Sequence, residues 1–293
     1  MRAAQLLAAA VLCGFLAGCA SQRNAPEGTV TVGTFNMEWL GDGPGDRKPR
    51  TDADYLRIAD IVIKSGADVL GVQEVENEAA LRKVLRYCQD FDGMVLKGET
   101  DQNVGVIWRK SVTVDSIGPF DGLVVQPKRS RPGLVVRCRY EGFDWLMMVV
   151  HLKSTSRFDS TNQLRELARE IRSKQAAALR NWSDSVLASG AEQDVLIVGD
   201  MNDFPSRRSM PTLTTLVDSP SMRFLTKDMK SCGRADRMAI DHVIASTQAS
   251  KRAIASSIRT EDFYAFLDKE SADNVSDHCP VLVRFHSAAA DND

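Results

Sequence analysis

Runs of apolar residues followed directly by polar ones recur along the chain. In the clearest case, residues 195–198 are four apolar residues, three of them β-branched, followed by Gly199 and then by Asp200 and Asn202. Such a run predicts a strand buried on both faces, and open α/β proteins build sites at the ends of such strands. Taken alone, the segment fits a strand followed by a structural Asp/Asn turn better than it fits a functional site. However, five other strand-like runs end in the same way, which indicates a site.

Hydrophobic periodicity predicts the elements of one α/β domain with mixed sheets, because strands alternate with helices early and crowd together later. Strands are expected at 30–35, 69–72, 94–96, 104–108, 134–139, 144–150, 195–198, 239–244 and 281–285, and helices at about 51–64, 78–88 and 161–187. The long helix is expected to bury Leu164, Leu167, Ile171, Ala178, Trp182 and Val186. Strand periodicity also predicts that Asn36 and Glu38 point the same way.

The length of the chain and its charge set broad limits. With 293 residues, of which 43% are hydrophobic, it can bury a full core. The formal net charge of −2 provides no global positive field of the kind that attracts nucleic acid. A divalent metal in a site would supply positive charge for a phosphate, so a phosphate-bearing substrate stays compatible with this composition.

The N-terminus predicts export and a lipid anchor. Arg2 precedes a short apolar run over residues 6–16, which is too short to span a bilayer and ends in Leu-Ala-Gly-Cys at Cys19. This ending resembles the bacterial lipobox, so we expect a signal peptide at 1–18 and a lipidated Cys19. A tether then follows at 19–29, the domain at 30–286 and a tail at 287–293. An ordinary signal peptide with an incidental cysteine is the alternative.

Four cysteines remain after Cys19: Cys88, Cys138, Cys232 and Cys279. An even set in an oxidising compartment predicts one or two disulfides, whose pairing the sequence leaves open. The chain has no Cys-x-x-Cys and no His-x-x-x-His pair, which argues against a thiolate or zinc site.

The polar residues at the predicted strand ends are carboxylates, amides and two histidines. They are Asn36, Glu38, Glu74, His151, Asp200, Asn202, Asp241, Asp277 and His278. Oxygen ligands suit Mg²⁺, Mn²⁺ or Ca²⁺, and Asn and His suit a phosphoryl oxygen and an attacking water. The set therefore predicts metal-assisted phosphoester hydrolysis.

Six segments, in this order, resemble motifs of the endonuclease/exonuclease/phosphatase superfamily, the fold of deoxyribonuclease I. They are Thr-Phe-Asn-Met-Glu at 34–38, Gly-Val-Gln-Glu at 71–74, Val-His-Leu-Lys-Ser at 150–154, Gly-Asp-Met-Asn at 199–202, Ile-Asp-His at 240–242 and Ser-Asp-His at 276–278. The resemblance covers residues 30–286. It implies a four-layered α/β sandwich of two packed mixed β-sheets flanked by helices.

The resemblance also implies roles for single residues. The metal ligands would be Glu74, with Asn36 beside it, and then Glu38 and Asp277; the catalytic residues would be His151, Asp200, Asn202, Asp241 and His278. Asp200 would align the attacking water or hold a second metal, and Asn202 would bind the scissile phosphate. His151 would stabilise the transition state. His278, oriented by Asp241, would contact the phosphate or act as base.

Two basic residues are predicted to bind substrate, Arg131 and Lys153. Arg131 belongs to the basic cluster 128–132, which is either a solvated loop or a phosphate contact beside an anionic site. The Arg131-Pro132 pair resembles a substrate-facing strand start of secreted relatives. For Lys153, a structural role and a phosphate-screening role both stay open.

The leading hypothesis is a monomeric, lipid-anchored phosphodiesterase of the cell envelope that uses Mg²⁺, with Mn²⁺ or Ca²⁺ as alternatives. We expect it to be a nuclease acting on DNA or RNA, with no protein partner. A phosphatase or phospholipase of the same fold is the first alternative. A non-catalytic binding module on a nuclease scaffold is the second, and it would be marked by loss of Glu74, Asp200, Asn202 or His278, all of which are present.

Overall fold

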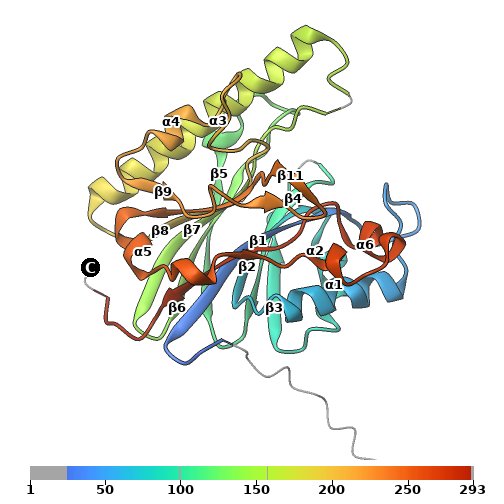
Figure 1. Ribbon diagram of the computed structural model, residues 1–293, viewed down its shortest axis with the longest axis horizontal. Helices are drawn as coiled ribbons and strands as arrows, with labels where there is room; N and C mark the ends of the chain where they lie inside the picture. The colour runs from blue at the N-terminus through green and yellow to red at the C-terminus, as the bar shows by residue number, and fades with distance from the viewer. Residues whose placement is uncertain (1–24, 99, 157, 292–293) are drawn as a thin grey trace, which may run out of the picture.

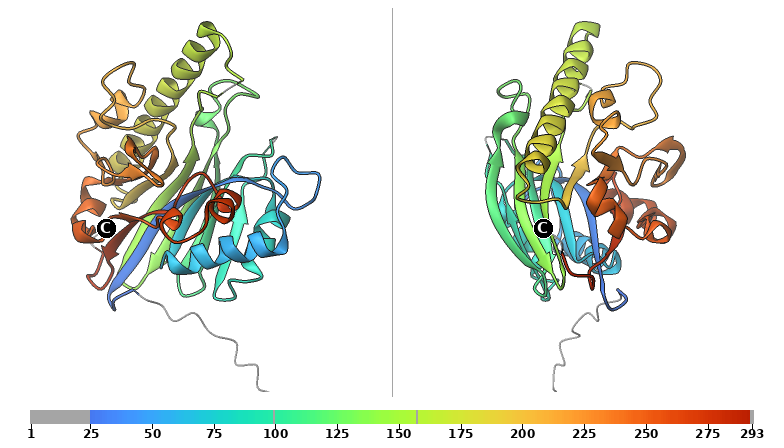
Figure 2. Two further views of the ribbon diagram at one scale, coloured as in Figure 1. Left: turned by 45° about the vertical axis from the view of Figure 1, so that its right-hand side comes forward. Right: turned by 90° about the vertical axis from the view of Figure 1, so that its left-hand side faces the viewer.

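The computed structural model describes residues 25–98, 100–156 and 158–291. Two six-stranded mixed sheets pack face to face, and helices cover the outer face of each sheet (Figures 1 and 2). The predicted α/β sandwich of four layers is confirmed. The predicted signal peptide and Cys19 lie outside the described residues. Within the described part of the chain, no helix is both long and apolar enough to cross a membrane.

Each sheet contains one parallel pair among antiparallel neighbours. In spatial order, the first sheet consists of β13 (Arg259–Thr260), β14 (Val281–His286), β1 (Thr29–Leu40), β2 (Val69–Val75), β4 (Asn103–Arg109) and β3 (Phe91–Val95). The second consists of β5 (Thr113–Phe120), β6 (Gly133–Tyr140), β7 (Phe143–His151), β8 (Val195–Asp200), β12 (Asp241–Ser246) and β9 (Met222–Phe224). The parallel pairs are β1–β2 and β7–β8. Parallel strands end at the same edge of a sheet, so each sheet brings two strand ends together.

The helices separate by layer. Three pack on the first sheet, α1 (Asp52–Lys64), α2 (Glu78–Leu85) and α6 (Lys269–Val275), whereas α3 (Asn162–Ser189) and α4 (Thr214–Val217) pack on the second and α5 (Thr247–Arg252) follows β12. Short 3₁₀ turns occur at Asp121–Leu123, Ala255–Ser257 and Phe263–Ala265. The start of α1 follows from local sequence, since Thr51 and Asp54 form a capping box.

The core between the two sheets is narrow where β2 faces the second sheet. A Cβ added at Gly71 on β2 would lie 2.7 Å from Cγ2 of Val198 on β8 and 3.0 Å from Cγ1 of Val149 on β7. Such a contact is shorter than packed carbon atoms allow, so the close approach of the sheets requires a glycine there.

The buried face of α3 differs from the prediction. Its buried residues are Ala168, Ile171, Arg172, Gln175, Ala176, Leu179 and Ser183, and the other predicted residues flank this face half-buried. The two long polar side chains of the buried stripe, Arg172 and Gln175, are satisfied by the backbone after β7. Arg172 Nη1 donates to the carbonyl of Lys153 at 2.6 Å, and Gln175 Oε1 accepts from the Lys153 N–H at 2.8 Å. The helix thereby fixes the chain that leaves His151.

Of the four cysteines, two are bonded to each other. Cys232 and Cys279 form a disulfide with a Cα–Cα distance of 5.9 Å. Cys88 and Cys138 are buried free thiols, and burial raises the pKa of both, that of Cys88 to about 12. Of the one or two disulfides expected, the structure contains one, and it joins two segments beside the site described next.

Candidate active site

Four functional side chains lie where the parallel strand pairs end at one edge of the sandwich. Asn36 on β1 and Glu74 on β2 come from the first sheet, and His151 on β7 and Asp200 on β8 come from the second. His151 and Asp200 are register partners across their parallel pair. Residues far apart in sequence therefore converge because both sheets end at this edge.

The backbone leaves the extended conformation at these strand ends. Glu74 has a φ of 59° and Asn202 a φ of 51°, which L-residues adopt rarely. Gly199 has a φ of 149°, and a Cβ there would lie 1.9 Å from the carbonyl oxygen of Val150. Such conformations concentrate at functional sites, and here they redirect the side chains at the strand ends.

The inner cluster joins the two sheets through Asn36. Its Nδ2 donates to Glu74 Oε1 at 3.3 Å and to Asp200 Oδ2 at 3.1 Å. His151 Nε2 lies 3.7 Å from Glu74 Oε1 and 3.6 Å from Asp200 Oδ2. Asn36, His151 and Asp200 are buried. The predicted metal ligands Asn36 and Glu74 thus contact the predicted catalytic residues Asp200 and His151 directly.

Arg131 fixes the protonation of His151. A guanidinium donates and never accepts, so its contact from Nη1 to Nδ1 of His151 places the ring proton on Nε2, facing the two carboxylates. Burial and then the positive charge of Arg131 hold the pKa of His151 well below its usual value. His151 is therefore a neutral hydrogen-bond donor, and Arg131 lies beside it, while the substrate-binding role of Arg131 stays a prediction.

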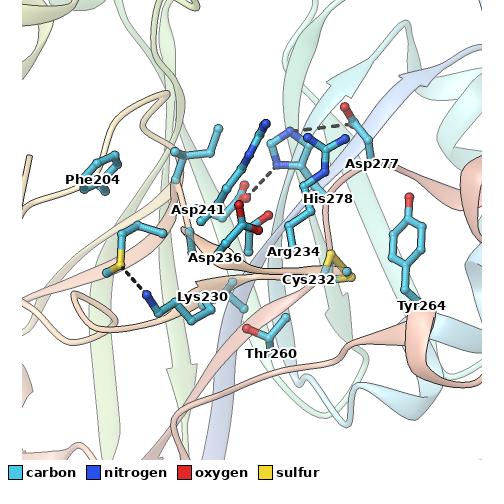
Figure 3. A pocket seen from close by; sticks show the side chains of 18 of the residues that line it. Phe204, Lys230, Cys232, Arg234, Asp236, Asp241, Thr260, Tyr264, Asp277 and His278 are labelled. Carbon is cyan, nitrogen blue, oxygen red and sulfur yellow. Dashed lines mark hydrogen bonds and ion pairs between the residues drawn. A yellow bond between two sulfur atoms is a disulfide. The ribbon is translucent and has the colours of Figure 1, made fainter.

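His278 has the opposite partner. Its Nδ1 donates to Asp241 Oδ2 at 2.7 Å (Figure 3), while Nε2 lies 4.0 Å from Asp200 Oδ2. Burial would lower the pKa of His278, but the negative charges of Asp241 and Asp200 outweigh it and hold that pKa well above its usual value. The backbone is fixed as well, because the His278 N–H donates to Ser276 Oγ, which itself donates to the Asn36 carbonyl.

Asn202 is held by Asp200 and by the backbone that follows His151. Its backbone N–H donates to Asp200 Oδ1 at 2.7 Å, and its Nδ2 donates to the carbonyl of Leu152, next to His151, at 3.1 Å. The carboxamide is therefore oriented beside the inner cluster. Its predicted contact with the scissile phosphate stays a prediction.

The donor set fits a divalent cation. Burial, and then the neighbouring charge of Asp241, raises the pKa of Asp200 to about 7, which indicates that the carboxylates repel one another when no cation is bound. Asp241 Oδ1 is buried without a hydrogen-bond partner among the described residues. Ligand atoms of Asp200, Asp241 and His278 lie within 4.8 Å of one another. Carboxylate oxygens of this kind suit Mg²⁺ or Mn²⁺.

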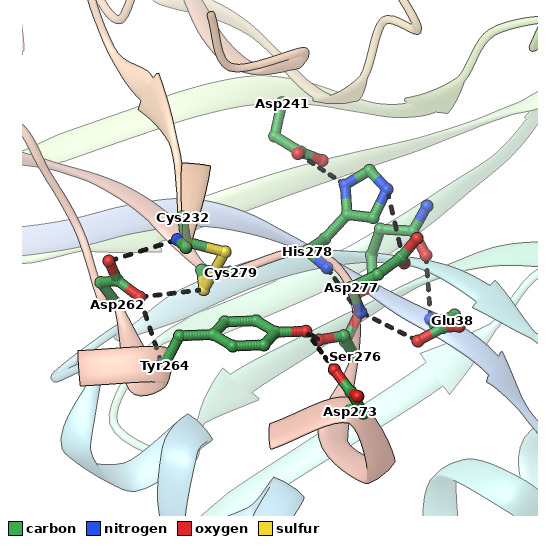
Figure 4. The surroundings of a disulfide bond; sticks show 12 residues. Glu38, Cys232, Asp241, Asp262, Tyr264, Asp273, Ser276, Asp277, His278 and Cys279 are labelled. Atoms are coloured by element: carbon green, nitrogen blue, oxygen red, sulfur yellow. Dashed lines mark hydrogen bonds and ion pairs between the residues drawn. A yellow bond between two sulfur atoms is a disulfide. The ribbon is translucent and has the colours of Figure 1, made fainter. Parts of the chain in front are cut away.

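Glu38 does not point the same way as Asn36, so that prediction is wrong. The β1–β2 register shifts between Asn36 and Leu40, and both Glu38 and Trp39 have positive φ. This irregularity turns Glu38 to an ion pair with Lys48 and to the N–H of Asp277, which donates to its Oε2 at 2.8 Å (Figure 4). Burial and then Asp277 raise the pKa of Glu38.

Two further predicted residues lie toward the outside of the site. The side chain of Asp277 is 66% exposed, with Oδ1 3.8 Å from His278 Nε2. The ammonium of Lys153 lies 3.4 Å from Asp159. The geometry therefore favours Asp200, which shares Asn36 and His151 with Glu74, over Glu38 and Asp277 as the partner of Glu74. The substrate-binding role of Lys153 stays a prediction.

Arg50 supports the site and was missed from the sequence. Its guanidinium donates to the carbonyl groups of Met37, Glu38, Trp39, Asn274 and Val275. It thereby joins the irregular end of β1 to the segment that leads to His278. It lies in a loop rich in Gly, Pro and Asp, and no pattern in the sequence distinguishes it from a solvated arginine.

On the His278 side, the site opens into a pocket of about 950 Å³. Asp241, Asp277 and His278 form one wall. A short hairpin of β10 (Lys230–Ser231) and β11 (Arg234–Met238) forms another (Figure 3).

Comparison with known proteins identifies a family. The sequence matches the model of the Endonuclease/Exonuclease/phosphatase family over residues 33–278. Among proteins with curated descriptions, none has a significantly similar sequence.

Several solved structures share the fold. TDP2 from Caenorhabditis elegans is 16% identical with a TM-score of 0.62, over 88% of this chain and 97% of that one. D. rerio TDP2 in complex with a single-strand DNA product is 15% identical, with a TM-score of 0.59 over 88% and 98% of the two chains. A mannosyl-6-phosphatase from Bacteroides thetaiotaomicron is 15% identical, with a TM-score of 0.58 over 87% and 98%. At these identities the likeness shows the fold, while the family match and the site together support metal-dependent phosphoester hydrolysis.

Proposed function

Because the chain belongs to the endonuclease/exonuclease/phosphatase family, we propose that it is a divalent-metal-dependent phosphodiesterase that cleaves DNA or RNA strands. One observation carries the proposal. His278, whose Nε2 lies 4.0 Å from Asp200 Oδ2 of the inner cluster, lines a pocket of about 950 Å³ together with Asp241. A pocket of this size leaves room for nucleotides beside the scissile phosphate.

Glu74 and Asp200 would hold the cation, with the Asn36 amide donating to both carboxylates; the cation is Mg²⁺ in this proposal, with Mn²⁺ and Ca²⁺ as alternatives. When bound, the cation supplies Lewis-acid polarisation of a phosphoryl oxygen. The Nε2–H of neutral His151 donates a hydrogen bond to the phosphate. Asp200, next to the backbone N–H of Asn202, orients the attacking water and accepts its proton. His278, charged through Asp241, contacts a phosphate oxygen and stabilises the negative charge that develops there.

The location in the cell envelope belongs to the same proposal. It is supported by the signal-like residues 1–18 with Cys19, and by the Cys232–Cys279 disulfide, since disulfides persist in oxidising compartments. We expect a monomer anchored through lipid on Cys19. Mass spectrometry of the mature N-terminus, with Cys19→Ser as the control, tests it. A lipid-free N-terminus in the natural host would reject the anchor.

A phosphatase acting on a sugar phosphate is the second candidate. It draws on the shared fold with the mannosyl-6-phosphatase, which covers 87% of this chain. This alternative requires the site to bind and hydrolyse a phosphomonoester instead of a phosphodiester.

The test is hydrolysis of plasmid DNA, total RNA, bis-p-nitrophenyl phosphate and mannose 6-phosphate, with Mg²⁺, Mn²⁺ or EDTA. Glu74→Ala and His278→Ala accompany the wild-type protein. Metal-dependent cleavage of nucleic acid, lost in both variants, is the expected result. Turnover of mannose 6-phosphate without cleavage of nucleic acid would favour the phosphatase. A folded protein that turns over no substrate would favour the binding module.

A further inference from the structure

A hairpin that the sequence did not predict lies next to His278. Strands β10 and β11 pair only with each other, through Lys230↔Met238 and Ser231↔Arg234, and belong to neither large sheet. In Figure 3 the side chain of Arg234 extends from the hairpin toward the side of the pocket where His278 lies. Both residues line the same pocket.

The hairpin is tied to the segment that carries His278. Cys232, in the turn, is bonded to Cys279, the residue after His278 (Figure 4). The N–H of Gly233 also donates to Asp262 Oδ2 at 3.4 Å. These two links fix the hairpin relative to the imidazole, so its side chains keep a defined position in the pocket.

The hairpin carries an excess of positive charge. Lys230, Arg234 and Arg237 are exposed cations that line the pocket, and Asp236 is the one carboxylate among them. Within the described residues, neither arginine forms an ion pair, and Lys230 Nζ contacts the sulfur of Met238 at 3.3 Å, which leaves its charge uncompensated.

The other carboxylates of the pocket wall are engaged elsewhere or lie at its edge. Asp241 accepts the hydrogen bond of His278, and Asp273 pairs with Lys269 at 2.6 Å. Asp277 lies near His278 Nε2. The free charge of the pocket beyond His278 is therefore that of the hairpin. Planar guanidinium groups bind phosphate oxygens in pairs of hydrogen bonds.

We propose that the hairpin is a phosphate subsite for a nucleic-acid strand: Arg234 and Arg237, with Lys230 at the base, bind the phosphodiester next to the scissile one. The disulfide holds this subsite at a fixed position relative to His278. The inference rests on the proposed function and adds to it the requirement for a second phosphate in the substrate.

The test compares two substrates of the Mg²⁺-loaded protein, bis-p-nitrophenyl phosphate and a short fluorescein-labelled oligothymidylate. Arg234→Gln combined with Arg237→Gln should lower kcat/KM for the oligonucleotide about 10- to 100-fold, mainly through KM, because charge-assisted contacts are lost. Hydrolysis of the small ester should not change. The dependence of binding on salt should become shallower by about 0.7 in a log–log plot, as expected when the contact to one phosphate of a single strand is lost.

Three further variants sharpen the test. Asp236→Asn removes the one negative charge of the hairpin and should raise affinity for the strand. Arg139→Gln removes an exposed arginine near the C-terminal end of β6, where it pairs with Asp115. This variant should hydrolyse both substrates like the wild-type protein. The double variant Cys232→Ser, Cys279→Ser should weaken binding of the oligonucleotide more than it lowers hydrolysis of the small ester. The reason is that Asp241 and Ser276 still hold His278. Thermal unfolding monitors the fold of each variant.

Binding of the oligonucleotide in EDTA, measured by fluorescence anisotropy, separates the proposed subsite from the proposed function. A wild-type protein that cleaves no nucleic acid would overturn the proposed function, whereas variants that bind and cleave like wild type would overturn the subsite alone. Equal loss on both substrates would also overturn it, since the hairpin would then act through His278. Vesicles of anionic phospholipid that bind with the same dependence on Arg234 and Arg237 would reassign it to a lipid surface.

Discussion

The two histidines of the site belong to opposite sides of it and carry different charge. His151 lies at the end of β7 in the second sheet with Arg131 on its Nδ1, whereas His278 precedes β14 of the first sheet with Asp241 on its Nδ1. Burial disfavours the charged form of both rings. The pKa of His151 falls well below its usual value, and that of His278 rises well above it.

The difference shows that the neighbour of Nδ1, rather than burial, decides what each ring can do. A cation on Nδ1 leaves a neutral ring that donates from Nε2. A carboxylate on Nδ1 stabilises an imidazolium, which adds positive charge beside the phosphate. One site thereby combines a neutral donor with a charged one, and each can be altered separately.

The largest effect is expected from replacing Glu74, one of the two carboxylates that His151 faces. Glu74→Ala removes a carboxylate of the proposed cation site and should lower the hydrolysis rate about 10³-fold. It should also weaken Mn²⁺ binding, measured by calorimetry, which is a readout independent of turnover. Glu78→Gln, an exposed change on α2, is the control. Retained Mn²⁺ affinity in the variant would place the cation elsewhere.

Asp241→Asn removes the charge that distinguishes His278. The carboxylate raises the pKa of His278, so that pKa should fall in the variant, and the rate should fall about 10²- to 10³-fold because the imidazolium is lost. An NMR titration of the metal-free protein measures the pKa, and the small ester measures the rate. If the pKa of His278 stayed high, another group would have to supply the charge.

His242 shows what burial does when no strong partner opposes it. Its ring is fully buried, Nδ1 contacts Thr226 Oγ1 at 3.0 Å, and burial lowers its pKa from 6.5 to about 4. The unfolded chain therefore takes up the proton first as pH falls. The folded state should lose about 2 kcal/mol of stability between pH 7 and pH 5 through this group.

His242→Gln should flatten the pH dependence of the unfolding midpoint over that range, measured by thermal denaturation. His286→Gln, on an exposed ring, should leave it unchanged. The same slope in wild type and in His242→Gln would assign the acid sensitivity to other groups.

Arg131→Gln makes the surroundings of His151 less positive and should raise the pKa of this ring. The orientation of Nε2–H becomes less defined, so the rate should fall about tenfold, as for other residues that orient a site ligand. Arg129→Gln, which alters a neighbour directed at Asp159, is the control. An unchanged rate would mean that packing alone orients His151.

Much of the fold follows from local pattern. The buried strands β2 and β8, the hairpin of β6 and β7, and the capped helix α1 all have strong signals in the sequence. The missed strands β5 and β11 are mostly exposed and lack an apolar face. They are extended because a partner strand pairs with them, and that pairing is not encoded locally.

For the candidate site, the six segments identified every residue of the inner cluster. Alternation failed at Glu38, because the irregular end of β1 breaks the period of two after Asn36. Arg50 and the basic hairpin were not found, since their position depends on which loops meet in space. What the sequence does encode is the set of side chains at the ends of buried strands.

The close approach of the two sheets at Gly71 and Val198 makes the packing of the core one determinant of the catalytic geometry. Glu74 and Asp200 belong to different sheets, so the separation of the sheets fixes the gap between these carboxylates. A displacement of about 1 Å in a catalytic group can cost about 10²-fold in rate. A larger residue in place of Gly71, three positions before Glu74, would then reduce turnover in a protein that still folds. Natural sequence variation at this position would therefore change activity rather than folding.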